Sequence, residues 1–290
     1  MCGDFALNIE LQGWSVKIQD ALEMVSQTHP GMVRSHNEDS VAFDLPSGLV
    51  VLADGMGGYN AGEVASGIAV SVVATEIKHR LESVKPEEQD AFSGEDEAVV
   101  LLRDNVQKAN SSIFHAAESQ PQYSGMGTTI VAALFYDDRV AVAHVGDSRM
   151  YRLRGETFET ITRDHSLLQE QIDSGMISKQ DARTSKNKNL VTRAVGIDDD
   201  VDVEIHIHDL QVGDVYLLCS DGLNDMVEDE DIGSTLQMLR ANLPLAATQL
   251  IQMANDNGGR DNVSVILVKV NGKFATPSGW VQKLLSWFKN

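Results

Sequence analysis

The order of strand-like and helix-like segments constrains the fold of this chain most. Short β-branched runs that end in turn residues predict strands, and helical patterns come in pairs instead of between successive strands. Strands and helices in separate blocks favour an α+β fold over alternating parallel βαβ units. The predicted strands are 22–29, 40–45, 48–54, 128–136, 139–146, 149–154, 157–162, 201–210, 214–220 and 262–270.

The predicted helices are 61–84 with 95–118, and 230–242 with 244–258. The segment TTIVAALFY-DD-RVAVAHVG predicts a hairpin that turns at Asp137-Asp138. A polar, helix-forming segment at about 164–190 lies between strands and is predicted to be an inserted flap. The first helical pair carries apolar residues on one face of each helix, namely Val64, Ile68 and Val72, and then Leu101, Val106 and Ile113.

The chain carries a large excess of acidic residues. Its formal net charge of −20 over 290 residues argues against a nucleic-acid-binding surface, because a phosphate backbone would be repelled. Part of that charge can instead form metal sites. We therefore expect no nucleic-acid partner, and we expect a monomer.

Cysteine content and the chain start indicate the compartment. The 2 cysteines, Cys2 and Cys219, cannot form a disulfide framework, and Cys219 in an apolar run is expected to be a buried thiol. The start MCGDFALNIELQG lacks the pattern of a signal peptide, and the apolar stretch at 65–77 is too short and too interrupted to span a bilayer. These features predict a cytoplasmic location.

The last twenty or so residues, 271–290, differ from the rest. They contain Lys273, Lys283 and Lys289 and no acidic residue, with large apolar side chains at near-helical spacing. A basic amphipathic helix of this kind can contact a membrane surface or an acidic partner, and it can equally dock on its own acidic domain.

Three predicted strands end in the same way, with an aspartate beside a glycine. These pairs are Asp54-Gly55, Gly146-Asp147 and Asp221-Gly222, and Asp261 lies in a glycine-bearing turn before the last strand. One such turn alone fits a helix N-cap equally well. Acids that leave several strands at one sheet edge can converge, at a cost of several kcal/mol unless cations neutralise them. Oxygen ligands without Cys or His favour Mg²⁺ or Mn²⁺.

The ordered motifs resemble those of the metal-dependent protein phosphatase family, type 2C, in its bacterial form. The resemblance runs from about Leu22 to Val270 through RSHNEDS, LADGMGGYNAGE, GMGTTIVAAL, AHVGDSRMYRLR, DHSL, LLCSDGL and GGRDNVSVILV. It implies a four-layer αββα sandwich, with two mixed or antiparallel sheets between pairs of helices. The implied organisation is an N-terminal extension (1–21), a catalytic domain (22–270) with the flap, and the basic tail (271–290).

The resemblance also implies ligands for two core metal ions, Mn²⁺ or Mg²⁺. Asp54 matches the carboxylate that bridges both ions, and the carbonyl of Gly55 matches a further ligand. Asp221 and Asp261 match the other ligands of the first ion. Asp147, together with Asp221, matches a weaker third site, although Asp147 could simply cap its turn.

Further roles are implied around this centre. Glu38 and Asp39 match acids that bind the second ion through water, with the alternative that Glu38 is solvated. Arg34 matches the guanidinium that binds the substrate phosphate, and Asn262 is expected to orient Asp261.

Other polar residues near the motifs have more ordinary interpretations. His36, His144 and His165 are expected to be structural histidines, and Thr128 and Thr129 are expected to form local hydrogen bonds. The chain departs from the family at two positions, with Met56 and Tyr59 where members carry histidine, so the group that protonates the leaving alkoxide is left open.

The resulting hypothesis is a metal-dependent protein phosphatase that hydrolyses phosphoserine and phosphothreonine by direct attack of a metal-bridging hydroxide. The catalytic residues would be Arg34, Asp39 and Asp54. Its partners would be phosphoprotein substrates and a cognate bacterial Ser/Thr kinase, which it would oppose. The alternative is a non-catalytic module that keeps the fold for binding. A P-loop hydrolase is excluded, because GMGGYNAGE lacks the Gly-Lys-Ser/Thr ending.

Overall fold

The computed structural model describes residues 17–58, 60–178, 181 and 190–274. Tyr59, most of the N-terminal extension and the basic tail from 275 onward lie outside the described residues. The predicted membrane or partner contact of that tail therefore stays a prediction. Along the part of the chain that is described, no helix is long and apolar enough to cross a membrane.

Two β-sheets form the centre of the molecule. One has the order β1-β11-β10-β7-β8 and the other β2-β3-β5-β6-β9, with β4 beside β3, and every pairing between neighbours is antiparallel. The first sheet contains β1 (Leu22–His29), β7 (Arg149–Arg154), β8 (Thr157–Thr160), β10 (Val215–Cys219) and β11 (Val263–Val270). The second contains β2 (Asp39–Asp44), β3 (Leu49–Met56), β4 (Gly127–Thr128), β5 (Ile130–Tyr136), β6 (Arg139–Val145) and β9 (Glu204–Asp209).

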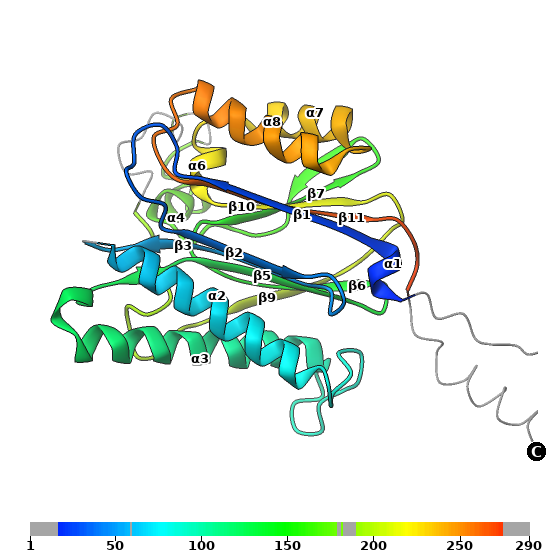
Figure 1. Cartoon of the computed structure of the whole chain (residues 1–290), viewed down its shortest axis with the longest axis horizontal. Coiled ribbons are helices and arrows are strands. Elements are labelled where there is room, and N and C mark those ends of the chain that lie inside the picture. The colour runs from blue at the N-terminus through cyan, green and yellow to red at the C-terminus, as the bar shows by residue number, and fades with distance from the viewer. Residues whose placement is uncertain (1–16, 59, 179–180, 182–189, 275–290) are drawn as a thin grey trace, which may run out of the picture.

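Pairs of helices cover the outer faces of the sheets (Figure 1). Helices α7 (Asp229–Leu239) and α8 (Leu243–Asp256) lie on the β1-containing sheet, and α2 (Ala61–Arg80) and α3 (Glu97–Ser119) lie on the other. This arrangement confirms the predicted four-layer α+β sandwich. The short helices are α1 (Ile18–Ala21), η1 (Pro121–Tyr123), α4 (Leu167–Asp173) and α6 (Asp221–Asn224).

Side chains alternate between the two faces of each strand, and the buried apolar side chains therefore form three layers. In β3, Leu49, Val51 and Ala53 pack against α2 and α3, whereas Val50 and Leu52 face the other sheet. Strand side chains alternate between faces, so each central strand contributes to two layers. In β10, Val215, Leu217 and Cys219 pack toward α7 and α8, while Tyr216 and Leu218 join the layer between the sheets.

The predicted hairpin and one helix face have different outcomes. Asp137 and Asp138 join β5 to β6 with φ angles of 45° and 55°, the positive values that a tight two-residue hairpin turn requires, which confirms the hairpin. The predicted apolar face of α2 packs against the core and is only partly buried. The fully buried face of this helix is made of small residues and Ile77, because α2 packs closely on β3, while Val64, Ile68 and Val72 are only partly buried. In α3, Leu101, Val106 and Ile113 are buried.

The predicted flap is described in part. Its helix α4 begins after Ser166, whose hydroxyl caps the helix by accepting a hydrogen bond of 3.2 Å from the backbone N–H of Gln169. Residues 179–180 and 182–189 lie outside the described part, so the flap boundaries at about 164 and 190 stay a prediction.

Candidate metal centre

The predicted site residues meet at one end of the layer between the two sheets. Asp54 continues the alternation of Val50 and Leu52 into that layer, and it lies directly opposite Asp39 across the β2–β3 pair. On the other sheet, Ser220 follows Tyr216 and Leu218 on the same face. Every second side chain of a strand points to the same face. The residues that follow the last apolar side chains on this face therefore place polar side chains where the apolar layer ends.

Two threonines at the end of β4, Thr128 and Thr129, fix the backbone of Asp54. Its N–H donates to Thr129 Oγ1 at 3.1 Å, and its carbonyl accepts from Thr128 Oγ1 at 2.8 Å and from the Thr129 N–H at 2.9 Å. These contacts confirm the local role expected for both threonines. Because the backbone is held on both sides, the direction of the Asp54 side chain is fixed.

Asp39 connects the two sheets. Its Oδ2 accepts a hydrogen bond of 2.8 Å from Ser220 Oγ, and Ser220 Oγ accepts in turn from the Ser264 N–H at 3.0 Å. The other carboxylate oxygen, Oδ1, is buried and has no hydrogen-bond partner among the described residues. A buried carboxylate oxygen without a donor is costly, and a water ligand of a metal ion would satisfy it.

Two turns present the next pair of carboxylates. Asp147 follows Gly146, which has a φ of +107°, and a Cβ at Gly146 would lie 2.7 Å from Thr129 Cβ. Asp221 begins α6 directly after β10. Asp147 is only 7% exposed, so it is buried at the end of its turn.

The loop that carries Arg34 and Glu38 is held by Asn262. The Asn262 side chain accepts from the Glu38 N–H at 2.8 Å and donates to the carbonyls of Pro30 and His36 at 3.0 and 2.8 Å. The expectation that Asn262 orients Asp261 is met only by its backbone, whose N–H donates to Asp261 Oδ1 at 2.9 Å. Its side chain positions the loop instead.

Arg34 is exposed, and its Nη2 forms a salt bridge of 2.7 Å with Asp261 Oδ2. The residue predicted to bind phosphate thus contacts a residue predicted to bind metal. Charge-assisted pairing of this kind aims the guanidinium at the edge of the site.

Close backbone packing explains the glycine after Asp54. A Cβ at Gly55 would lie 2.0 Å from the carbonyl oxygen of Gly62 in α2 and 2.7 Å from that of Glu38. Only a residue without a side chain fits there. By contrast, a Cβ at Gly58 would meet no atom within 4 Å.

Mutual repulsion strains the carboxylates at the centre. Burial first, and then the charges of Asp39, Asp221, Asp147 and Asp261, raise the pKa of Asp54 well above its usual range. Burial and the charges of Asp147, Asp225 and Asp261 likewise raise the pKa of Asp221. Each shift means that the folded protein disfavours the ionised form when no cation is present.

The neighbouring acids show the same trend. Burial, although opposed by hydrogen bonds from Ser264 and Ser220, raises the pKa of Asp39 to about 6. Burial and the charge of Asp164 raise the pKa of Asp147 to about 6. Burial also raises the pKa of Glu38. Like charges that are buried together in this way are favourable only beside cations.

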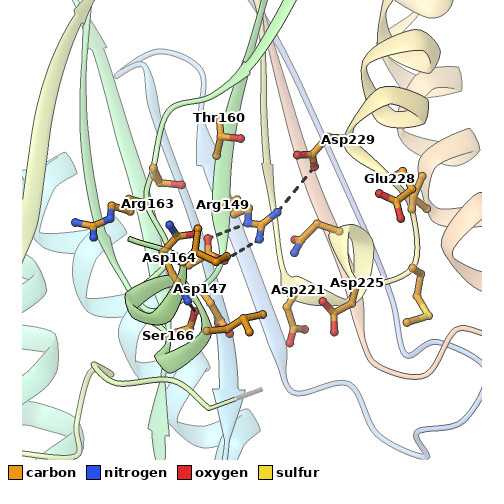
Figure 2. A pocket seen from close by; sticks show the side chains of 17 residues that line it. Asp147, Arg149, Thr160, Arg163, Asp164, Ser166, Asp221, Asp225, Glu228 and Asp229 are labelled. Atoms are coloured by element: carbon orange, nitrogen blue, oxygen red, sulfur yellow. Dashed lines mark hydrogen bonds and ion pairs between the residues drawn. The ribbon is translucent and has the colours of Figure 1, made fainter. Parts of the chain in front are cut away.

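A cavity of about 430 Å³ opens beside the centre, between α4 and the segment that carries α6. Figure 2 shows Asp147, Asp221 and Asp225 along the same edge of this cavity, with Asp164 and Arg149 beside Asp147 in its lining. Arg149 donates to both carboxylate oxygens of Asp164 at 2.8 and 2.7 Å. The acidic edge and the cavity form one continuous site.

The donor set suits hard divalent cations. Every predicted ligand atom is an oxygen, and these acids do not close around one point. Among the described residues, only His144, His165 and Glu204 place three ligand atoms within 4.8 Å of one another. Carboxylate and carbonyl oxygens are the ligands that Mg²⁺ and Mn²⁺ prefer in proteins.

The three histidines near the motifs have different surroundings. His36 is exposed, and its backbone carbonyl, not its ring, accepts the hydrogen bond from Asn262. His144 is buried, its Nε2 donates to the carbonyl of Arg163 at 2.9 Å, and its Nδ1 has no partner among the described residues. His165 has partners on both ring nitrogens. Only His165 therefore fits the expectation of a fully satisfied structural histidine.

Sequence reasoning missed Ser220, Asp225 and Asp164. Ser220 lies one residue before Asp221 on the alternating face of β10, which was a usable signal. Asp225 lies four residues after Asp221, one helical turn away, and this spacing also predicts proximity. Asp164 is far from Asp147 in sequence, and only the return of the chain from β8 places it nearby.

Comparison with known proteins agrees with this geometry. The sequence profile described as protein phosphatase 2C matches residues 32–263. A protein named serine/threonine phosphatase stp, from Listeria welshimeri, is 40% identical over 248 residues, which cover 84% of this chain and 94% of that protein.

Solved structures give the same family. The Mycobacterium tuberculosis serine/threonine phosphatase PstP/Ppp superposes with a TM-score of 0.78 at 35% identity, over 87% of this chain and 100% of that one. A structure of the PstP catalytic domain in complex with 2 manganese ions gives a TM-score of 0.75 at 35% identity, over 87% and 99%. With motifs, fold and acidic centre all in agreement, the chain belongs to the protein phosphatase 2C family.

Proposed function

We propose that this protein is a Mn²⁺- or Mg²⁺-dependent phosphatase that hydrolyses phosphoserine and phosphothreonine esters in proteins. The observation that carries the proposal is the group of buried and half-buried carboxylates with raised pKa values where the apolar layer between the sheets ends. A binding module would not need this costly arrangement. The names of the relatives also favour an enzyme over the non-catalytic alternative.

We assign the residues as follows. Asp54 would hold both core ions together with the Gly55 carbonyl, and Asp221 and Asp261 would supply further ligands to the first of them. Asp39 and Glu38 would bind the second ion through water, and Asp147 with Asp221 would hold a weaker third ion. When bound, such ions neutralise the acids, polarise the phosphate and supply an activated water as nucleophile.

The residues of the chain then have distinct tasks. Arg34, which is 53% exposed at its side chain, can turn from Asp261 toward a phosphate and bind two of its oxygens. Asp39, held by Ser220, keeps one oxygen free to orient a water. The position after Gly55 is Met56, so no histidine directly after Gly55 can protonate the leaving group.

The partners follow from the reaction. Phosphoproteins are the substrates, and we propose that the enzyme opposes a cognate bacterial Ser/Thr kinase as a cytoplasmic monomer. The acidic surface, with a net charge of −20, supports the exclusion of nucleic acid as a partner.

The test is turnover by the purified full-length chain after removal of metal with EDTA. Phosphoserine and phosphothreonine peptides are assayed for phosphate release with no metal, with Mn²⁺ and with Mg²⁺. We expect release only after a metal is restored, and at least a hundred-fold loss in an Asp54→Asn variant. An Asp104→Asn variant, which removes an exposed charge on α3, is the control. Absence of turnover in the metal-loaded wild type would contradict the proposal.

A further inference from the structure

His165 is the one histidine of DHSL, a motif to which the reaction assigns no task. It lies where the chain enters the flap, and it is 8% exposed. Its ring stacks on the ring of His144 with 4.7 Å between the centroids. Its contacts lead in two directions, toward Gly146 and toward Glu204.

The first set of contacts surrounds Gly146. The Gly146 N–H donates to Nδ1 of the His165 ring at 3.1 Å, and the His165 N–H donates to the Gly146 carbonyl at 2.9 Å. One residue thus binds both peptide groups of Gly146, and the second of these groups leads directly into Asp147. Because glycine has wide conformational freedom, a turn with a φ of +107° depends on such contacts.

The second set reaches the base of the flap and the edge strand β9. The His165 carbonyl accepts from the Thr192 N–H at 2.9 Å, and neighbouring Ser166 pairs with Val191. His165 Nε2 lies 3.1 Å from Glu204 Oε2. His165 therefore joins the entry and exit of the flap to the turn that carries Asp147.

The hydrogen bonds define the protonation of the ring. Nδ1 accepts from a backbone N–H and so carries no proton, which leaves the proton of the neutral ring on Nε2, facing Glu204. This tautomer disfavours a separate metal site formed by His144, His165 and Glu204, since Nε2 would have to be free of its proton. Arg193 Nη1, which lies 3.3 Å from the same Nε2, adds a positive charge that also opposes a cation there.

We propose that His165 is a positioning residue for Asp147, acting through the two peptide groups of Gly146. It links the base of the flap to the ion that Asp147 holds. The inference rests on the proposed function in one respect, namely that Asp147 is a metal ligand. Loss of a residue that orients a ligand typically weakens metal binding by about 10- to 100-fold.

Two substitutions separate the two sides of the ring. In His165→Asn the side-chain oxygen can take the place of Nδ1 and accept from Gly146, whereas in His165→Gln the amide nitrogen can take the place of Nε2 and donate to Glu204. His206→Ala is the matched control, because His206 also binds Glu204, at 2.7 Å, and is on the exposed side of β9. The Asp147→Asn variant identifies which bound ion depends on Asp147.

The measurement is Mn²⁺ binding to the full-length chain, followed by the electron paramagnetic resonance signal of free Mn²⁺. We expect Asp147→Asn to lose the weakest class of ion. His165→Gln should weaken that class about 10- to 100-fold, while His165→Asn and His206→Ala stay within about three-fold of wild type. Equal behaviour of the Asn and Gln variants, or wild-type binding by His165→Gln, would overturn the inference.

A second measurement needs no variant. The ¹⁵N shifts of the His165 ring in the wild-type protein should report a proton on Nε2 and none on Nδ1, and the opposite tautomer would overturn the inference even if a variant fails to fold. The outcomes of these experiments distinguish a failure of this inference from a failure of the proposed function. Wild type that neither binds Mn²⁺ nor releases phosphate contradicts that function. Unchanged ion number in Asp147→Asn overturns the assignment of Asp147 as a ligand and this inference with it, and leaves the proposed phosphatase activity standing.

Discussion

Arg34 Nη2 lies 2.7 Å from Asp261 Oδ2, so the guanidinium proposed for the phosphate is paired with a carboxylate proposed for a metal ion. The pair joins the loop before β2 to the turn before β11, which are far apart in sequence. Because Asp261 is shared, a bound cation would compete with Arg34 for this carboxylate and release the guanidinium toward substrate. The salt bridge thus suggests that metal loading prepares the phosphate site.

Arg34→Ala should chiefly raise KM for a small phosphoester such as p-nitrophenyl phosphate. A charge-assisted hydrogen bond contributes about 1.5–3 kcal/mol, which corresponds to a rise of about ten-fold or more. Steady-state kinetics at saturating Mn²⁺ measure the effect, and Arg260→Ala, which removes the same charge beside Asp261, is the control. A collapse of kcat at unchanged KM would contradict a role in binding the phosphate.

Asp221→Asn should abolish turnover and yet stabilise the metal-free protein. The raised pKa of Asp221 shows that its ionised form is disfavoured in the fold by burial and by Asp147 and Asp225, and an amide removes that charge. Urea unfolding in EDTA and phosphate release with Mn²⁺ provide the two readouts. Asp104→Asn on α3 should change neither. Residual activity above a few per cent would mean that Asp221 is assigned wrongly.

Much of this architecture could be predicted from local patterns. The Asp137-Asp138 hairpin and the buried face of α3 follow from turn chemistry and from helical periodicity, and both are present. The face of α2 could not be predicted in this way. Its larger residues Val64, Ile68 and Val72 suggest one face, but close approach to β3 selects Ala65, Ala69 and Val73 for the contact. Interhelical and helix–sheet distances are not encoded in one segment.

The candidate site likewise combines residues that one segment predicts with contacts that depend on several segments. Strand-end aspartates such as Asp54 and Asp221 were predicted, because alternation and glycine mark them within one segment. Contacts between distant segments were not predicted. They include the hydrogen bond between Ser220 and Asp39 across the sheets and the salt bridge between Arg34 and Asp261. The hydrogen bonds of His165 to Gly146 likewise depend on how the chain after β8 approaches the end of β6.

Gly55→Ala should inactivate the enzyme by displacing backbone. The new Cβ would lie 2.0 Å from the Gly62 carbonyl oxygen, so β3 and α2 must separate where Asp54 is held. Overpacking of this kind typically costs about 1–3 kcal/mol of unfolding free energy. Gly58→Ala is a matched control in the same loop, because its Cβ would meet nothing within 4 Å. If both variants kept wild-type turnover and thermal stability, the packing argument for Gly55 would be wrong.

The pKa of Asp39 predicts a specific pH dependence for the metal-free protein. Burial raises this pKa from 3.8 to about 6 in the folded state, so the folded protein binds the proton more tightly than the unfolded chain does. Ionisation of Asp39 therefore removes stability as pH rises from about 4 to about 6, by ~3 kcal/mol in total, since one pKa unit corresponds to about 1.4 kcal/mol.

Asp39→Asn does not titrate. Its free energy of unfolding minus that of wild type, measured by urea in EDTA at a series of pH values, should rise by about this amount between pH 4 and pH 7 and then level off. The subtraction cancels the titrating groups that do not interact with Asp39, and a pH-independent difference would contradict the assignment of a strained, buried carboxylate.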